Sequence, residues 1–179
     1  MKTLKINKEV LYSKEEITRV NFRDIKKLKL LALKNESKKI RLCTHKNIKD
    51  NLQEMLIIHP KDCYVWPHKH INKNESFHII EGLVDIILFD NFGKVIDFIE
   101  MGDSKSGKNF YYRLSQSKYH TLIIKSKLLV FHEITKGPFK KKDTIWAPWA
   151  PDEKNKTQVK NYLNQLKSEI KTIKKKKNV

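Results

Sequence analysis

The sequence predicts an all-β domain, a single β-barrel or sandwich with a helical segment before it and a helix after it. Between residues 41 and 139, short apolar and β-branched runs alternate with turn residues, at the spacing typical of all-β folds. The two flanks instead show apolar residues at helical spacing. With 179 residues, the chain is long enough for one domain with a sizeable core and too short for two ordinary ones.

We therefore divide the chain into an N-terminal strand and helical lead at 1–40, a barrel at 41–153, and a C-terminal helix with a basic tail at 154–179. In the lead, Val10–Tyr12 suits a short strand and Ser13 to Glu16 fits a capping box, which predicts one or two helices ending near residues 34–37. If there are two helices, the break falls near Asn21. In the last part, helical periodicity runs from Val159 to Ile173, and we expect Lys174–Lys177 to be a frayed, solvated end.

Nine extended segments are expected in the barrel region, together with the histidine-rich stretch described below. They are Arg41–His45, Leu52–His59, Cys63–Pro67, Ser76–Glu81, Leu83–Phe89, Val95–Met101, Phe110–Leu114, Thr121–Lys125 and Leu128–Ile134. The prolines of Trp146–Pro151 argue against regular structure there, although its tryptophans must be partly buried and can cover a sheet edge.

The net charge of +18 suggests a nucleic-acid-binding protein, but the charge is unevenly distributed along the chain. Residues 1–50 carry +9, residues 51–139 carry +1, and residues 140–179 carry +8. The excess therefore lies in the flanks. Basic flanks attract phosphates, but arginines are few and no aromatic residues are interleaved with the lysines as in a stacking platform. This pattern argues against a nucleic-acid partner.

No apolar run reaches the length of a transmembrane span, and the first residues lack the apolar region of a signal peptide. Cys43 and Cys63 have neither metal-site nor disulfide-framework spacing, so we expect two small buried residues. A cytoplasmic protein is the resulting expectation.

The most informative stretch runs from His68 to Gly82. His68 and His70 are separated by one residue, so on an extended strand both side chains point to the same face. Glu75 follows after a short turn and can fold back beside them. Two imidazoles and a carboxylate on one face form part of a site for a first-row transition metal.

The spacing HxHx4Ex6G, matched here without a gap, resembles the first motif of the cupin superfamily. The second motif, PxGxxH, has its counterpart at Ser115 to His120, with serines in place of the proline and the glycine. The resemblance implies a cupin (jelly-roll) β-barrel and a metal held by His68, His70, Glu75 and His120. In this reading His78, three residues after Glu75, points to the opposite face.

Over Arg41 to Glu153 the chain is also similar to the WbuC-type cupin-fold metalloproteins. The similarity rests on Tyr64–His70, Glu75–Phe77 with Glu81–Gly82, Tyr119–Thr121, Glu133 with Gly137–Phe139, and Ala147–Glu153. It implies a small metal-binding barrel found among polysaccharide and O-antigen biosynthesis proteins. The chain also looks distantly like the nucleotide-sugar ketoisomerases and epimerases that share the barrel.

Three histidines and one carboxylate suit Fe(II), Mn, Ni, Co or Zn, and the ligand types do not choose among these divalent ions. Such an ion can polarise a carbonyl or lower the pKa of a bound water, as a sugar or keto-acid substrate would require.

Further side chains are candidates for substrate chemistry. Arg41, His45 and Arg113 are the most suitable anion-binding groups, although each could be an ordinary surface or paired charge. Glu133 could act as a general base or anchor an arginine, and Tyr64 lies on the segment leading into His68.

Three functional hypotheses follow. The first is a metal-dependent enzyme, such as an isomerase, epimerase or oxygenase, acting on a small sugar-derived or keto-acid metabolite in surface-polysaccharide synthesis. The second is a non-catalytic cupin that binds a sugar or an acid through its metal. The third is binding to nucleic acid or a membrane surface through the basic flanks. A small-molecule substrate and a homodimer are the partners that the first reading implies.

Overall fold

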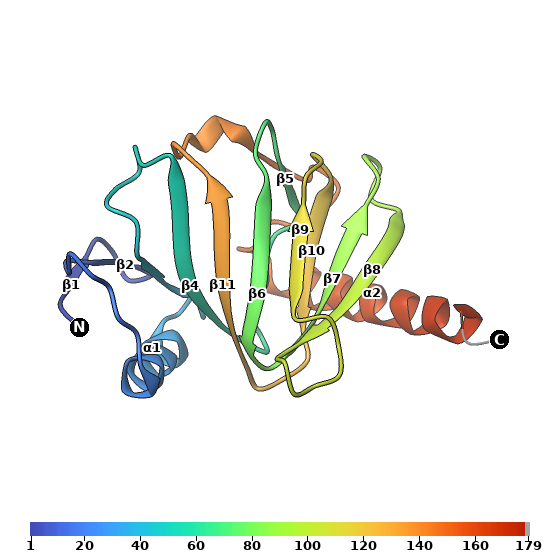
Figure 1. The fold of residues 1–179 in the computed structure, drawn as a ribbon. Helices are drawn as coiled ribbons and strands as arrows, with labels where there is room; N and C mark the ends of the chain where they lie inside the picture. The colour runs from blue at the N-terminus through green and yellow to red at the C-terminus, as the bar shows by residue number, and fades with distance from the viewer. Residues whose placement is uncertain (178–179) are drawn as a thin grey trace.

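The structure, a computed structural model, describes residues 1–177 and contains twelve strands, two α-helices and a 3₁₀ turn in that range. Figure 1 shows their arrangement. The strands are β1 (Thr3–Lys5), β2 (Val10–Ser13), β3 (Ile40–Cys43), β4 (Leu52–Pro60), β5 (His68–His70), β6 (Glu75–Glu81), β7 (Leu83–Phe89), β8 (Val95–Gly102), β9 (Tyr111–Leu114), β10 (Tyr119–Ile124), β11 (Leu128–Lys136) and β12 (Thr144–Trp146). The helices are α1 (Phe22–Lys34), the 3₁₀ turn η1 (Lys141–Asp143) and α2 (Lys156–Lys177).

The strands form two sheets. The larger has the order β1-β2-β3-β4-β11-β6-β9, and the smaller has the order β12-β5-β10-β7-β8. Among the described strands, all strand-to-strand pairings are antiparallel except that of β2 with β3. The predicted all-β fold with flanking helices is confirmed, and its two sheets agree with a cupin-type barrel.

The main core lies between the sheets because alternate residues of each strand point inward. Phe77 and Ile79 of β6 meet Ile86 of β7 and Leu122 of β10 in one apolar cluster. Cys43 and Cys63 are free thiols buried in the same cluster. Burial raises the pKa of Cys43 to about 11 and that of Cys63 to about 12, so both remain protonated at neutral pH.

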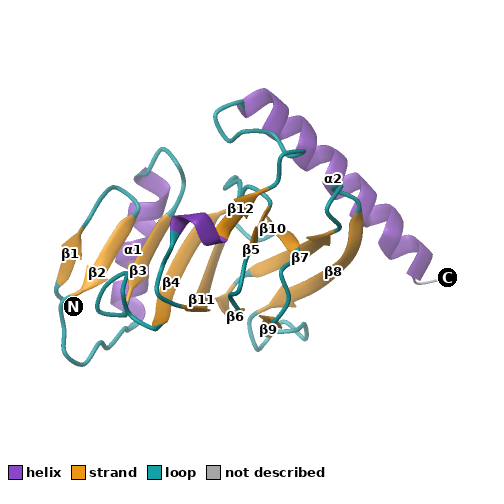
Figure 2. Cartoon of the chain, turned by 90° about the horizontal axis from the view of Figure 1, so that it is seen from above, coloured by secondary structure: helices purple, strands orange, loops and turns teal. Residues whose placement is uncertain are grey.

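Helix α1 covers the outer face of the larger sheet beside β3 and β4 (Figure 2). Its buried residues Ile25, Leu28 and Ala32 belong to a second apolar cluster with residues of β3, β4 and β11. The prediction that a helix begins after Ser13 is wrong. Asn21 is the N-cap and forms a capping box with Asp24, whereas Ser13 ends β2 and its hydroxyl accepts hydrogen bonds from Glu15 and Thr18.

Helix α2 runs along the outer face of the smaller sheet, beside β7 and β8 (Figure 2). Leu166 and Ile170 pack with Ile87 and Phe89 of β7 and Ile123 of β10. This is the amphipathic helix that the spacing of apolar residues predicted.

The end of α2 differs from the prediction of a frayed tail. Lys174 is helical, and its ammonium lies 2.7 Å from a carboxylate oxygen of Glu100 and 3.3 Å from one of Asp85. Lys125 lies 2.7 Å from the other Asp85 oxygen. The buried Asp85 thus needs lysine partners from the sheet and from α2, which orders this end of the helix. Residues 178–179, the last of the predicted tail, lie outside the described residues.

Two further predictions differ from the structure. Residues 63–67 are not a strand, because they cross from one sheet to the other. Trp146, expected in an irregular segment, ends β12, which pairs with β5 and so covers that edge of the smaller sheet. Neither of the described helices is long and apolar enough to cross a membrane.

The lysine–carboxylate cluster yields a test. The hydrogen bond from Lys174 is the largest influence on Glu100, and it helps lower the pKa of that carboxyl to about 2, from an ordinary value of 4.5. Lys174→Met should lower the free energy of unfolding by about 1 kcal/mol at neutral pH, since the ion pairs are partly exposed. Because the folded state depresses this pKa, the loss should be complete above pH 4.5 and shrink as the pH falls toward 2.

Urea unfolding of both proteins across this pH range measures the effect. Lys171→Met is the matched control, because Lys171 is exposed on the same helix and has no ion pair among the described residues. An equal loss in both variants, or a loss that does not change with pH, would contradict this account.

Candidate metal centre

Three histidines converge at the inner face of the smaller sheet. His68 and His70 lie on the short strand β5 and share a face, as the period of two requires. β10 pairs with β5 so that His120 is directly opposite His68. The nitrogen atoms that can bind a metal all lie within 4.8 Å of one another.

Glu75 brings a carboxylate from the other sheet. It is the first residue of β6, and its side chain is only 3% exposed. One carboxylate oxygen lies 2.9 Å from Nε2 of His120, and the other lies 3.3 Å from Nε2 of His70. The four residues named by the cupin-like motifs therefore meet at one point between the sheets.

Protein groups hold the Nδ1 atom of each ring. Nδ1 of His68 hydrogen-bonds the carbonyl of Trp66 at 2.8 Å, and Nδ1 of His120 hydrogen-bonds that of Lys118 at 3.0 Å. Nδ1 of His70 lies 3.2 Å from the hydroxyl of Thr144 on β12. A proton on each Nδ1 leaves the Nε2 lone pair free, as in histidines that ligate metals through Nε2.

Two atoms at the centre are buried without a well-aligned hydrogen-bond partner among the described residues. These are Nε2 of His120 and Oε1 of Glu75, which lie close together but are not aligned for a hydrogen bond. A cation between the rings and the carboxylate would satisfy both atoms, so the residues present fit a metal ion.

Burial and neighbouring charges set the protonation of the cluster. Burial, followed by the nearby His120 and His70, lowers the pKa of His68 to about 3 and keeps this ring neutral. Burial alone would raise the pKa of Glu75, but the nearby rings of His120 and His70 outweigh it and lower that pKa. For His120, burial acts to lower the pKa, but Glu75 raises it overall. The fold therefore favours the ionised carboxylate of Glu75 beside these rings.

Polar groups continue from the centre into the barrel. Thr135 of β11 pairs with Glu75, and its hydroxyl is buried without a partner among the described residues. The same holds for the hydroxyl of Tyr112 on β9, whose pKa is raised by burial and then by Glu75. Neither residue was predicted from the sequence, although Thr135 follows Glu133 by the period of two.

Glu133 lies on the inward face of β11, two residues from the core residue Phe131. Burial and the charge of Glu75 raise the pKa of Glu133 to about 7, while the charge of Arg41 acts in the opposite direction. Arg41 reaches this interior from β3, where it shares a face with Cys43. The structure thus brings Arg41 within electrostatic range of Glu133.

His45 follows β3 and is also buried. Its Nδ1 hydrogen-bonds the backbone of Glu54, its ring meets Tyr12 edge-on at 5.2 Å, and its Nε2 has no partner among the described residues. It lies on the β3 side of the larger sheet, separated from β6 by β4 and β11.

Three other histidine, arginine and tyrosine positions lie away from the centre. Arg113 is exposed and donates to Ser115, and it pairs with Ser76, which points away from the side of Glu75. The hydroxyl of Tyr64 donates to the carbonyl of Pro151 at 3.0 Å, so this residue supports a loop. His78 is exposed against Phe110, which agrees with its expected outward direction.

The aromatic surroundings of the centre come from β12 and the segment before β5. Trp146 is about half exposed, and its ring centroid lies 5.2 Å from that of His68 and 5.6 Å from that of Trp66. Nε1 of Trp66 donates to the carbonyl of Ala147. These contacts fix β12, and with it Thr144, against the histidine strand.

Comparisons with known proteins give a family match over residues 20–101, to a domain of unknown function (DUF6016). The match covers less than half of the chain. No curated protein matches the sequence.

Several solved structures align with part of the chain. Protein SO0799 from Shewanella oneidensis aligns with a TM-score of 0.47 and 8% identity, over 57% of this chain and 66% of that chain. CapF, solved with the inhibitor 3-isopropenyl-tropolone, aligns with a TM-score of 0.47 and 18% identity, over 60% of this chain and 31% of CapF. Oxalate decarboxylase of Bacillus subtilis, which has Mn(II) centres, aligns with a TM-score of 0.43 and 17% identity, over 54% and 24%. The chain spans less than two thirds of the length of each of these proteins.

Proposed function

We propose that this protein is a metal-binding cupin whose divalent ion is held by His68, His70, Glu75 and His120. The observation that carries the proposal is the set of Nδ1 hydrogen bonds, which leaves three Nε2 atoms and a buried carboxylate facing one point. The mixed nitrogen and oxygen donors suit Fe, Mn, Ni, Co or Zn without selecting one. When bound, such an ion supplies Lewis-acid chemistry.

Metal analysis tests the proposal. The chelator-treated protein should take up one ion per chain from solutions of Mn(II), Fe(II), Co(II), Ni(II) or Zn(II), as measured by elemental analysis after desalting. His70→Ala should weaken binding by at least roughly a hundredfold, because one of four ligands is lost.

His78→Ala is the matched control, since His78 is an exposed histidine on the opposite face of β6. It should bind metal as the wild type does. A wild-type protein that binds none of the five ions, or an equal loss in both variants, would overturn the proposal.

The hydrogen bond from His70 to Thr144 gives a second test. Thr144→Val preserves the shape of the side chain but removes the oxygen 3.2 Å from Nδ1 of His70. Metal affinity should fall by about 10–100-fold, the usual effect of removing a group that orients a ligand. Competition with a fluorescent chelator measures it, and Thr172→Val, on the exposed side of α2, is the control. Unchanged affinity in Thr144→Val would show that His70 does not depend on this bond.

We further propose that this protein is a metal-dependent enzyme that acts on a small sugar-derived or keto-acid metabolite. The WbuC-type resemblance implies that this metabolite belongs to surface-polysaccharide synthesis. Glu133, with its pKa raised to about 7, would accept and return a proton at its carboxylate, as an isomerase or epimerase requires. Arg41 would hold a carboxylate or phosphate of the substrate, and Tyr112 and Thr135 would orient its hydroxyl groups.

Incubation of the metal-loaded protein with keto acids and keto-sugar nucleotides in deuterated water tests this part. An epimerase or isomerase should incorporate deuterium at the carbon next to the carbonyl, and Glu133→Gln should abolish incorporation while retaining the metal. Ligand binding without incorporation or turnover would instead identify a non-catalytic binding protein.

A further inference from the structure

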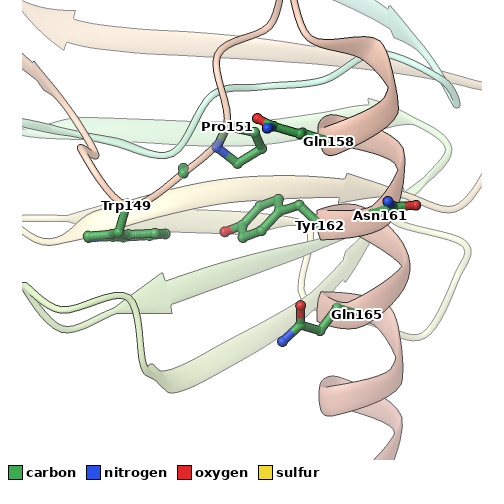
Figure 3. Close-up of a pocket in the computed structure, with 7 residues that line it drawn as sticks. Trp149, Pro151, Gln158, Asn161, Tyr162 and Gln165 are labelled. Carbon is green, nitrogen blue, oxygen red and sulfur yellow. The ribbon is translucent and has the colours of Figure 1, made fainter.

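A surface pocket lies away from the metal centre, between the loop after β12 and the first half of α2. It has a volume of about 390 Å³, within the range of small-molecule pockets. We call it the Trp149 pocket. It is lined by Trp149, Ala150, Pro151, Gln158, Asn161, Tyr162 and Gln165. Figure 3 shows Gln158, Tyr162 and Gln165 projecting from the helix toward the loop that carries Trp149, while the amide of Asn161 points the other way.

The loop side of the pocket is held rigidly. The ring of Trp149 lies 5.0 Å from that of Phe89 and 5.7 Å from that of Tyr119, centroid to centroid. Gly93 packs on the indole so closely that a Cβ atom there would lie 2.8 Å from it, and its φ of +92° also favours glycine. The sheet therefore fixes the position of Trp149 before any ligand arrives.

Tyr64 joins the two sides of the pocket. Its hydroxyl donates to the carbonyl of Pro151, and its ring meets that of Tyr162 edge-on at 6.4 Å. One buried side chain thus holds both the loop and the helix. Because the loop and the helix are already held in place, a ligand would bind without the loss of affinity that comes from ordering them.

The helix side presents a polar face with helical spacing. Gln158, Tyr162 and Gln165 are separated by four and three residues, so they lie along one face over two turns. The amides of Gln158 and Gln165 are exposed, and no hydrogen bond engages them among the described residues. Each amide offers both donors and an acceptor, the combination that pairs with a hydroxyl group.

Two atoms of the aromatic residues are left without partners. Nε1 of Trp149 and the hydroxyl of Tyr162 are covered from solvent and find no hydrogen-bond partner in residues 1–177. Burial raises the pKa of Tyr162, so the phenol stays protonated and neutral. In Figure 3 this hydroxyl points toward the ring of Trp149, across the pocket.

The lining carries no formal charge, although the chain has a net charge of +18 and α2 is rich in lysine. A phosphate or carboxylate would find no cation there, and a purely apolar ligand would leave the amides unused. Aromatic rings beside amides and hydroxyls suit a molecule with both apolar C–H faces and many hydroxyl groups.

We infer that the Trp149 pocket binds a neutral polyhydroxylated ligand of the size of a sugar ring, either a free sugar or a unit of a glycan chain. The inference does not depend on the metal centre. The ligand would lie between the indole and the face of α2, with its hydroxyls bonded to Gln158 and Gln165.

Ligand-observed NMR with the full-length, chelator-treated protein tests the inference. The probes are D-glucose, D-galactose, N-acetyl-D-glucosamine and the trisaccharide maltotriose, which separates free sugars from glycan units. At least one should bind saturably and shift the indole N–H resonance of Trp149, assigned with Trp149→Phe. Gln158→Leu and Gln165→Leu should each weaken that binding by roughly tenfold, the effect of a lost hydrogen bond of about 1.4 kcal/mol.

Asn164→Leu is the matched control, because Asn164 is an exposed amide on α2 outside the pocket lining. It should bind as the wild type does. The absence of saturable binding by any of the four sugars would overturn the inference, and so would an equal loss in Asn164→Leu. Tighter binding of D-glucuronate than of D-glucose would also overturn it, since the lining has no cation for a carboxylate.

Discussion

The burial of Glu75 between two apolar sheets is the constraint on which the centre of this protein depends. An ionised carboxylate removed from water needs close partners of opposite or complementary charge. Here the partners come from the facing sheet, because β5 and β10 place His70 and His120 beside the two carboxylate oxygens. Each histidine ring is in turn held from behind at Nδ1. The position of one buried charge therefore requires a specific register in both sheets.

Much of this arrangement follows from the sequence by the alternation of side chains along strands. The separation of His68 and His70 predicted a shared face, and the position of His78 predicted the opposite face of β6, as the structure has them. Thr144 could not be found in this way. Its contact with His70 exists only because β12 pairs with β5, and the prolines after Trp146 concealed that strand. Local patterns show which face a side chain takes but not which strand will lie beside it.

The helices show the same limit. The periodicity of apolar residues predicted both α1 and α2, but the start of α1 depends on a choice between two capping sequences. Ser13 lies in β2, where it pairs with Thr3, and Asn21 is the N-cap of α1. At the other end of the chain, Lys174 looked like part of a solvated tail. Its place is determined by Asp85 and Glu100, far away in the sequence and near in space.

The same long-range pairing gives the basic flanks a structural role. Lys29 of α1 pairs with Glu81, Lys39 pairs with Glu153, and Lys174 of α2 pairs with Asp85 and Glu100. The barrel segment is nearly neutral overall, and several of its carboxylates thus receive a lysine from the flanks. Positive charge that resembles a nucleic-acid signal in the sequence helps attach both helices to the sheets. The lining of the Trp149 pocket differs from these lysine-rich contacts. None of its residues is charged, although α2, which supplies much of it, is rich in lysine.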